Sequence, residues 1–240
     1  MTTYARLVPY DLLHCTRRLP PAVVTVLKEF SGQLFLAGGF IRAVISGEEV
    51  ADIDLIAASP EVASKAAERL RVIPNFASAV PLEGPRRMHT SGNAYTVSGL
   101  GAVPVQIIHR WTYTEVEQAL ESFDFTIACA ALYWACEPER EPRWESRTHP
   151  NYYADLAAKR LVYRAPGRSE DAGGSLLRVM KFVRRGYSIP LDSLGAVLAR
   201  ISLGVNYATR MAQDERGLAD VFTGLLREVD PLVDPDHIAH

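Results

Sequence analysis

The sequence lacks several features that would place a chain in a specialised class. Its three cysteines, Cys15, Cys129 and Cys136, are odd in number and show no CxxC or Cys/His spacing, so neither a disulfide framework nor a zinc site is expected. No apolar run approaches the roughly 18 residues of a membrane helix. The opening residues, MTTYARLVPYDLL, lack the basic-then-apolar pattern of a signal peptide. These absences predict a cytoplasmic protein with reduced thiols and no membrane partner.

An excess of charge of one sign is missing as well. The chain has 26 Lys and Arg residues and 28 Asp and Glu residues, a formal net charge of −2. It therefore has no global field that would attract nucleic acid, and a bound polyanion would need a local basic patch. What remains is an ordinary globular composition, 48% hydrophobic over 240 residues, which suits one large domain or two small ones.

The hydrophobic pattern changes along the chain. Short apolar runs typical of strands alternate with helical segments in the first part, and helical periodicity dominates the rest. We therefore expect an α/β (α+β) head with a mixed sheet over residues 1–149, with its core at about 30–135, and a small helical body over 150–240. Polar stretches at 75–93 and 137–149 predict loops.

One stretch, LAGGFIRAVISGEEVADIDLIAASPE (residues 36–61), combines features that suggest chemistry. A glycine pair at the start of a helix lets backbone N–H groups approach a phosphate. Asp52 and Asp54, two positions apart on a strand, point the same way and offer the oxygen ligands that Mg²⁺ prefers. The alternative interpretation is an ordinary strand-to-helix turn followed by an Asp-x-Asp sequence without a function, since each of the two is common. Asp52 and Asp54 lie in an otherwise apolar strand, however, where a carboxylate needs a partner or a metal.

This stretch resembles the nucleotidyltransferase signature of the DNA polymerase β superfamily, and in particular the poly(A) polymerase head domain of bacterial poly(A) polymerases and class II CCA-adding enzymes. That family reads roughly Gly-Gly-x-x-Arg-Asp, a helix, and then Asp-x-Asp. FDFTIACAAL is similar to the family's Arg-Arg-Asp-Phe-Thr-Ile-Asn-Ala motif, and YADLAAKRLVYRAPGRSEDAGGSLLRVMKFVRRGYSI is similar to the segment that leaves the head. The resemblance covers about residues 34–190. It implies catalytic and metal-binding roles for Asp52 and Asp54, and nucleotide-binding roles for Gly38, Gly39, Arg42, Asp124, Asp171 and Arg178.

The resemblance also implies an activity. The expected protein is a metal-dependent nucleotidyltransferase that uses Mg²⁺ (or Mn²⁺) and transfers a nucleoside monophosphate from an NTP to an acceptor. The acceptor expected first is RNA, such as the 3′ end of a tRNA. Residues 191–240 are all that follow the segment leaving the head, so we expect handling of a full tRNA to need a dimer or another partner.

The chain also departs from the family pattern. Ala43 stands where the family has aspartate, and Ser122 and Phe123 replace the arginine pair before the next motif. Ser175 lies near the position of a base-reading arginine, and Gln106 occupies the position where a third metal-binding carboxylate is expected. These departures leave two alternatives open. One is a catalytically weak nucleotide-binding or regulatory module, and the other is a toxin-like nucleotidyltransferase that acts on protein or a small molecule.

Two groups of basic residues complete the candidates. Each has an ordinary interpretation as a solvated surface and a functional one as a binding site for phosphates. The first group is a pair of arginines in a predicted loop. The second lies on one predicted helix that would bury Val179, Phe182 and Val183. The members are Arg86 and Arg87 in the loop, and Arg178, Lys181, Arg184 and Arg185 on the helix.

Overall fold

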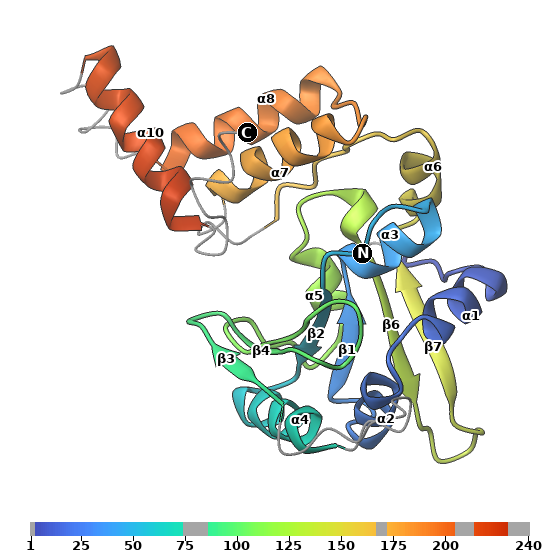
Figure 1. Ribbon diagram of the computed structural model, residues 1–240. Coiled ribbons are helices and arrows are strands. Elements are labelled where there is room, and N and C mark those ends of the chain that lie inside the picture. The colour runs from blue at the N-terminus through green and yellow to red at the C-terminus, as the bar shows by residue number, and fades with distance from the viewer. Residues whose placement is uncertain (1–2, 74–85, 167–171, 205–213, 230–240) are drawn as a thin grey trace. The chain divides into compact units, whose positions relative to one another are not determined.

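The computed structural model describes residues 3–73, 86–166, 172–204 and 214–229. The chain divides into two compact units (Figure 1). The first, which we call the sheet unit, comprises Met1–Phe123 and Ile127–Leu156. The second, the helical unit, comprises Asp124–Thr126 and Ala157–His240. The short segment 124–126 thus belongs to the helical unit although both of its neighbours in the chain belong to the sheet unit.

Within the described residues, seven strands form one mixed sheet in the order β3-β4-β5-β2-β1-β6-β7. β2 and β5 run parallel, and the other neighbouring strands run antiparallel. This arrangement confirms the mixed sheet expected from the sequence. The strands are β1 (Leu34–Ala37), β2 (Ile53–Ala57), β3 (Met88–Thr90), β4 (Ala94–Val97), β5 (Val105–Ile108), β6 (Ala130–Ala135) and β7 (Arg143–Thr148).

Both faces of the sheet carry apolar residues, because side chains alternate along each strand. Leu36 and Leu55 are fully buried and face one side. The adjacent Phe35 and Ile56 face the other side, where they pack with Leu120 of α5. The helices of this unit are α1 (Pro9–Arg17), α2 (Pro21–Glu29), α3 (Gly39–Ser46), α4 (Pro60–Val72) and α5 (Val116–Glu121), with a 3-10 turn η1 at Thr126–Ala128.

Local signals placed several helix ends correctly. The Ser59 hydroxyl oxygen accepts a hydrogen bond from the Val62 N–H at 3.3 Å, and Pro60 is the first residue of α4. At the C-terminal end of α3, Gly47 adopts the left-handed conformation with φ of +67° and ends the helix, as expected from the sequence. These features fix the helices on both sides of β2 and hence the segment that carries Asp52 and Asp54.

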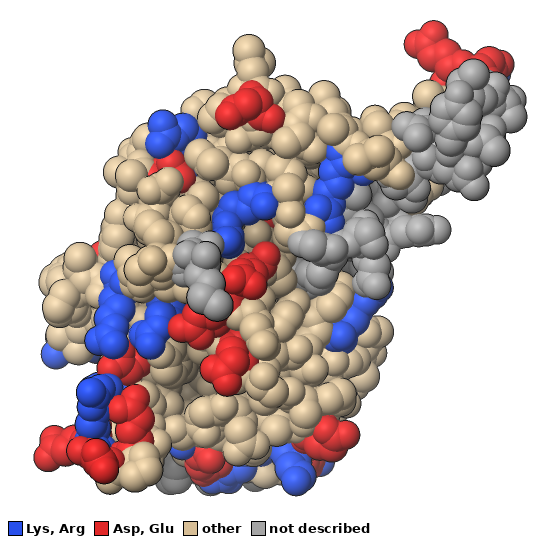
Figure 2. All heavy atoms as spheres, turned by 180° about the vertical axis from the view of Figure 1, so that it is seen from behind, with Lys and Arg blue, Asp and Glu red and all other residues tan. Residues whose placement is uncertain are grey.

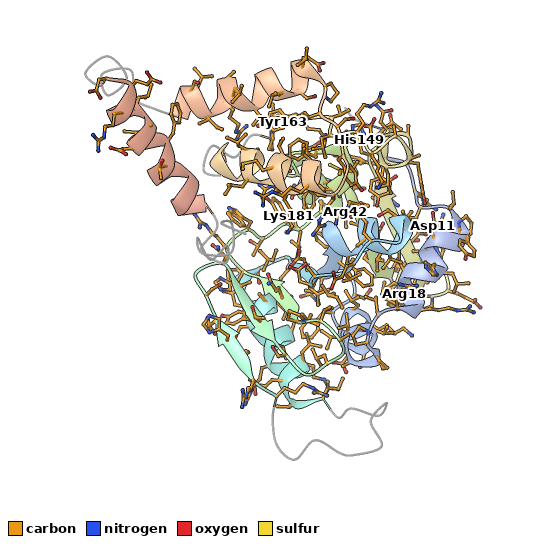
Figure 3. All side chains as sticks on the ribbon, turned by 45° about the horizontal axis from the view of Figure 1, so that its top comes forward. Asp11, Arg18, Arg42, His149, Tyr163 and Lys181 are labelled. Atoms are coloured by element: carbon orange, nitrogen blue, oxygen red, sulfur yellow. The ribbon has the colours of Figure 1, made fainter. Side chains whose placement is uncertain are left out.

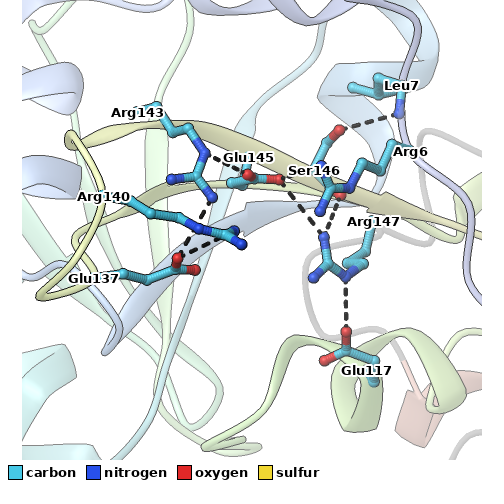
Figure 4. Close-up of polar contacts among 9 residues, drawn as sticks. All are labelled: Arg6, Leu7, Glu117, Glu137, Arg140, Arg143, Glu145, Ser146 and Arg147. Atoms are coloured by element: carbon cyan, nitrogen blue, oxygen red, sulfur yellow. Dashed lines mark hydrogen bonds and ion pairs between the residues drawn. The ribbon is translucent and has the colours of Figure 1, made fainter.

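Two stretches expected as loops contain strands. β3 lies within 75–93, and β7 lies within 137–149, where it forms the edge of the sheet beside β6. Residues 74–85 of the first stretch lie outside the described residues. β7 was missed because the face shared by Arg143, Glu145 and Arg147 is charged, so no apolar alternation marks the strand. These side chains satisfy one another through ion pairs instead (Figure 4).

The described part of the helical unit contains α7 (Ala172–Arg184), α8 (Leu191–Gly204) and α10 (Glu215–Val229), and α6 (Tyr152–Ala157) lies at its junction with the sheet unit. α7 packs against both α8 and α10. The segment 124–126 pairs with 162–164, since the Thr126 N–H donates to the Val162 carbonyl at 3.1 Å and the Arg164 N–H donates to the Asp124 carbonyl at 2.8 Å. Across the described ranges, no helix is long and apolar enough to cross a membrane.

Candidate functional site

The glycine pair forms the turn between β1 and α3. Gly38 has φ of +83°, a conformation that side-chain-bearing residues rarely adopt, and its N–H donates to the Ala130 carbonyl at 3.0 Å. Gly39 begins α3, and apart from its chain neighbours and the backbone of its own helix, no described atom lies within 4 Å of a Cβ placed there. The first N–H groups of a helix lack partners within the helix. A negatively charged group can therefore approach the backbone of α3 beside Gly39.

The two aspartates lie beside this turn. Asp52 immediately precedes β2, and Asp54 lies within it; both are half-buried, and Ile53 between them is buried. This alternation places both carboxylates on the same face of the strand. Leu36 of β1 pairs with Leu55 of β2, so the end of β1, where the glycine turn begins, lies next to Asp54. The structure thus brings Gly38, Gly39 and both aspartates to one region of the sheet unit.

A row of polar residues continues from Asp54 across the sheet. Asp54 pairs in register with Gln106 of β5, Gln106 with Thr96 of β4, and Thr96 with His89 of β3. Residues paired in register project from the same face of a sheet. The position expected from the sequence to hold a third carboxylate therefore lies directly beside Asp54, and it carries a neutral amide. Thr96 and His89 lie in no sequence motif, so their place in this row could not be foreseen from the sequence.

Arg42 lies in the middle of α3 (Figure 3). Only 7% of its side chain is exposed, and its Nε lies 3.4 Å from Oε2 of Glu48. Arg42, which was expected to bind nucleotide, is thus held next to an acidic side chain that follows the C-terminal end of α3. Ala43, where the resembled family has aspartate, is buried.

Phe123 replaces an arginine of the family pattern and lies against the glycine turn. Its ring atoms Cε1 and Cζ lie 3.4 and 3.6 Å from a Cβ placed on Gly38. A phenyl ring offers no hydrogen bond to a phosphate, so this position supplies an apolar surface where the family pattern would supply a cation. The contact could not be foreseen from the sequence, because it joins residues 85 positions apart.

In the helical unit, Asp124 and Arg178 bind each other. Asp124 is 4% exposed, and its Oδ2 accepts hydrogen bonds from Arg178 Nε at 2.7 Å and from the Ser175 hydroxyl at 2.9 Å. The Arg178 side chain is 38% exposed, so part of its guanidinium reaches solvent. Nearby, burial raises the pKa of Tyr163 (Figure 3). Asp171, also expected to bind nucleotide, lies outside the described residues.

The two basic groups expected from the sequence differ in exposure. Arg86 is buried, and its guanidinium donates to the carbonyls of Leu70, Ile73 and Gly99, so it fastens the end of α4 rather than clamping a phosphate. Burial lowers its pKa accordingly. Lys181 of α7 is exposed, as in the expected basic patch.

The helix that carries the second basic group is less buried than expected. Val183 is 49% exposed, so α7 does not bury it as the sequence suggested. On the face seen in Figure 2, basic and acidic side chains are interspersed.

The side chains beside the glycine turn fit a hard divalent cation if a nucleotide supplies further oxygen ligands. Asp52 and Asp54 supply carboxylate oxygens, but the described residues contain no cluster of three or more His, Cys, Asp or Glu side chains that could hold a metal ion. Mg²⁺ is commonly held by one or two carboxylates together with substrate phosphates. The donor set therefore fits a cation that is shared with a nucleotide.

Comparison with solved structures identifies the class of fold. The chain is similar to a Thermotoga maritima CCA-adding enzyme complexed with tRNA, with a TM-score of 0.55 and 16% identity over 95% of this chain and 51% of that one. It is also similar to a CCA-adding enzyme in complex with CTP (TM-score 0.56, 16% identity) and to one in complex with ATP (TM-score 0.57, 20% identity), each over 100% of this chain and 54% of the other. The chain thus spans about half the length of these structures, and it has a nucleotidyltransferase fold.

The family is given by a separate comparison. The profile of the Gabija anti-defense 2 family, Gad2, matches residues 17–159. The chain belongs to the Gabija anti-defense 2 family. The matched segment contains the glycine turn, both aspartates and Gln106, and it ends before α7. No curated protein matches the chain.

Proposed function

We propose that this protein is a metal-dependent nucleotidyltransferase that transfers a nucleoside monophosphate from an NTP to an acceptor. The observation that carries the proposal is the placement of Asp52 and Asp54 beside the Gly38–Gly39 turn in a nucleotidyltransferase fold. In the reaction, an acceptor oxygen forms a bond to the α-phosphorus, the bond to pyrophosphate breaks, and the acceptor proton is released.

Each proposed residue has a distinct task. Asp52 and Asp54 hold Mg²⁺ or Mn²⁺ together with the triphosphate, and the first N–H groups of α3 bind phosphate oxygens beside Gly39. When bound, the cation supplies charge that offsets the phosphates and the leaving pyrophosphate. The remaining proposed nucleotide-binding residues are Gly38, Arg42, Asp124, Asp171 and Arg178.

RNA is the first proposed acceptor, as expected from the sequence. Its support is the likeness to a CCA-adding enzyme complexed with tRNA. A second candidate is a component of the Gabija defence, a toxin-like use of the same transfer, which the family match favours. A third possibility is that the nucleotide is bound without transfer, and the neutral Gln106 beside Asp54 favours that outcome.

One assay separates these candidates. The purified protein is incubated with Mg²⁺ and each α-³²P-labelled NTP, together with tRNA, total RNA or purified components of a Gabija system. Incorporation into RNA supports the first candidate, and incorporation into protein supports the second. For either candidate, we expect both Asp52→Asn and Asp54→Asn to lose incorporation while their unfolding curves stay unchanged.

Labelling that persists in both variants would refute the assignment of the aspartates. Absence of labelling from every acceptor, combined with measurable NTP binding, would favour the nucleotide-binding module over the enzyme.

A further inference from the structure

The residue beside Asp54 carries a neutral side chain. Asp54 of β2 pairs in register with Gln106 of β5, and both side chains are half-buried between neighbours that are fully buried. Both therefore project from the same face, on strands about 4.8 Å apart. At that spacing the Gln106 amide can reach any group that the Asp54 carboxylate binds.

The next positions along the row are also uncharged or distant. Thr96 pairs with Gln106, and His89 lies one strand further, at the exposed edge strand β3. Three strand spacings separate His89 from Asp54, roughly 14 Å at the usual distance between strands. From Asp54 toward β3, the paired positions thus carry no carboxylate, and the side chain directly beside Asp54 is neutral.

The charge of that third side chain decides how a cation can be held. Mg²⁺ gives up its water ligands reluctantly, and two carboxylates with a neutral amide offer it less than three carboxylates would. The β- and γ-phosphates of an NTP would supply the missing negative oxygens. Binding of the cation and binding of the nucleotide would then each strengthen the other by the same factor.

We infer that Gln106 makes cation binding at Asp52 and Asp54 depend on the nucleotide, so that free Mg²⁺ or Mn²⁺ binds weakly and the cation is held with NTP. The inference rests on the proposed function, since it concerns the same site. It adds a specific role for Gln106: its neutral side chain keeps the site from holding a cation before the nucleotide arrives.

The variant Gln106→Glu tests this directly, because glutamate has the size and shape of glutamine and differs in charge. Free Mn²⁺ is titrated into the protein and measured by electron paramagnetic resonance, without nucleotide. We expect Gln106→Glu to bind Mn²⁺ at least about tenfold more tightly than the native protein. Adding Asp54→Asn to this variant should remove the gain.

Thr96→Glu is the matched control, since it adds the same charge on the same face one strand further from Asp54. It should bind free Mn²⁺ no more tightly than the native protein. A second measurement uses the native protein alone and therefore does not depend on any variant folding. A non-hydrolysable ATP analogue should raise its affinity for Mn²⁺ at least about tenfold.

The outcomes separate this inference from the proposed function. Tight Mn²⁺ binding by the native protein without nucleotide, or equal affinities in the native protein and a folded Gln106→Glu variant, would overturn the role of Gln106. Equal gains in Gln106→Glu and Thr96→Glu would overturn it too. Failure of the native protein to bind Mn²⁺ even with the ATP analogue would instead overturn the metal-dependent function itself.

Discussion

Replacing Glu145 by glutamine should destabilise the sheet unit, because this buried carboxylate of edge strand β7 pairs with three arginines (Figure 4). Its Oε1 accepts from Arg143 Nε at 2.6 Å, and its Oε2 lies 3.3 Å from Arg6 and 3.8 Å from Arg147. Glutamine keeps the shape of the side chain and removes the charge. The variant therefore measures the ion pairs without creating a cavity.

The size of the effect follows from exposure. The Glu145 side chain is 7% exposed, whereas those of Arg143, Arg147 and Arg6 are 33, 26 and 60% exposed. Removing one member of a fully buried pair costs about 3–5 kcal/mol, and an exposed pair contributes about 0.2–1 kcal/mol. Because the freed guanidiniums can turn into water, we expect an intermediate loss of about 2 kcal/mol. At about 2–4 °C per kcal/mol, the midpoint of thermal unfolding would fall by roughly 4–8 °C.

Tryptophan fluorescence during urea unfolding is the suitable assay. All three tryptophans, Trp111, Trp134 and Trp144, belong to the sheet unit, so the signal reports this unit even if the helical unit unfolds separately. Glu117→Gln is the control, since that carboxylate is 40% exposed and pairs with Arg147 at 2.9 Å. It should change stability by less than about 0.5 kcal/mol. A Glu145→Gln variant as stable as this control would refute the reasoning.

Three further predictions concern the turn, the thiols and the nucleotide. Gly38→Ala should lower the free energy of unfolding by about 1–2 kcal/mol through strain at φ of +83°. Gly39→Ala should unfold like the native protein but bind NTP more weakly in calorimetric titration, since its Cβ would occupy the open space beside α3. Burial raises the pKa of the Cys15 thiol to about 12 from 9.0. Because the folded pKa is the higher one, the stability that this shift contributes is present below pH 9.0 and falls as pH rises toward 12. In urea unfolding, the Cys15→Ala variant should therefore lose less stability than the native protein over this pH range. The four NTPs should bind within about tenfold of one another, and Arg178→Ala should weaken all four together in calorimetric titration, whereas a hundredfold preference for one base would contradict this.

Local sequence signals predicted the region around the two aspartates well. The glycine turn, the helix ended by Gly47 and the strand of Asp54 are encoded by neighbouring residues, through backbone conformation and alternating hydrophobicity. The pairing of Asp54 with Gln106 was accessible only through the family resemblance, because parallel strands are joined by long connections. The mixed sheet is confirmed, while the roles of the site residues stay predictions.

Strand β7 could not be predicted, for a physical reason that also applies elsewhere. Its stability rests on charge pairing between Arg143, Glu145 and Arg147, and a polar alternation of this kind resembles a solvated loop in sequence. Arg86 was misjudged for the same reason, since an arginine in a polar stretch is usually solvated, whereas here three carbonyl groups receive its N–H donors. In both cases the charged side chain is paired with groups that a polar stretch of sequence does not reveal.

The candidate site departs from the resembled family pattern at two positions that carry charge in that pattern. Phe123 at the glycine turn and Gln106 beside Asp54 both put neutral side chains where the resembled pattern has charge. A site that loses a cation near the phosphates and an anion near the metal keeps its net charge while weakening each separate interaction. We therefore expect nucleotide and cation to depend on each other for binding. Restoring only the anion, as in Gln106→Glu, should therefore free the cation from the nucleotide without improving nucleotide binding by itself.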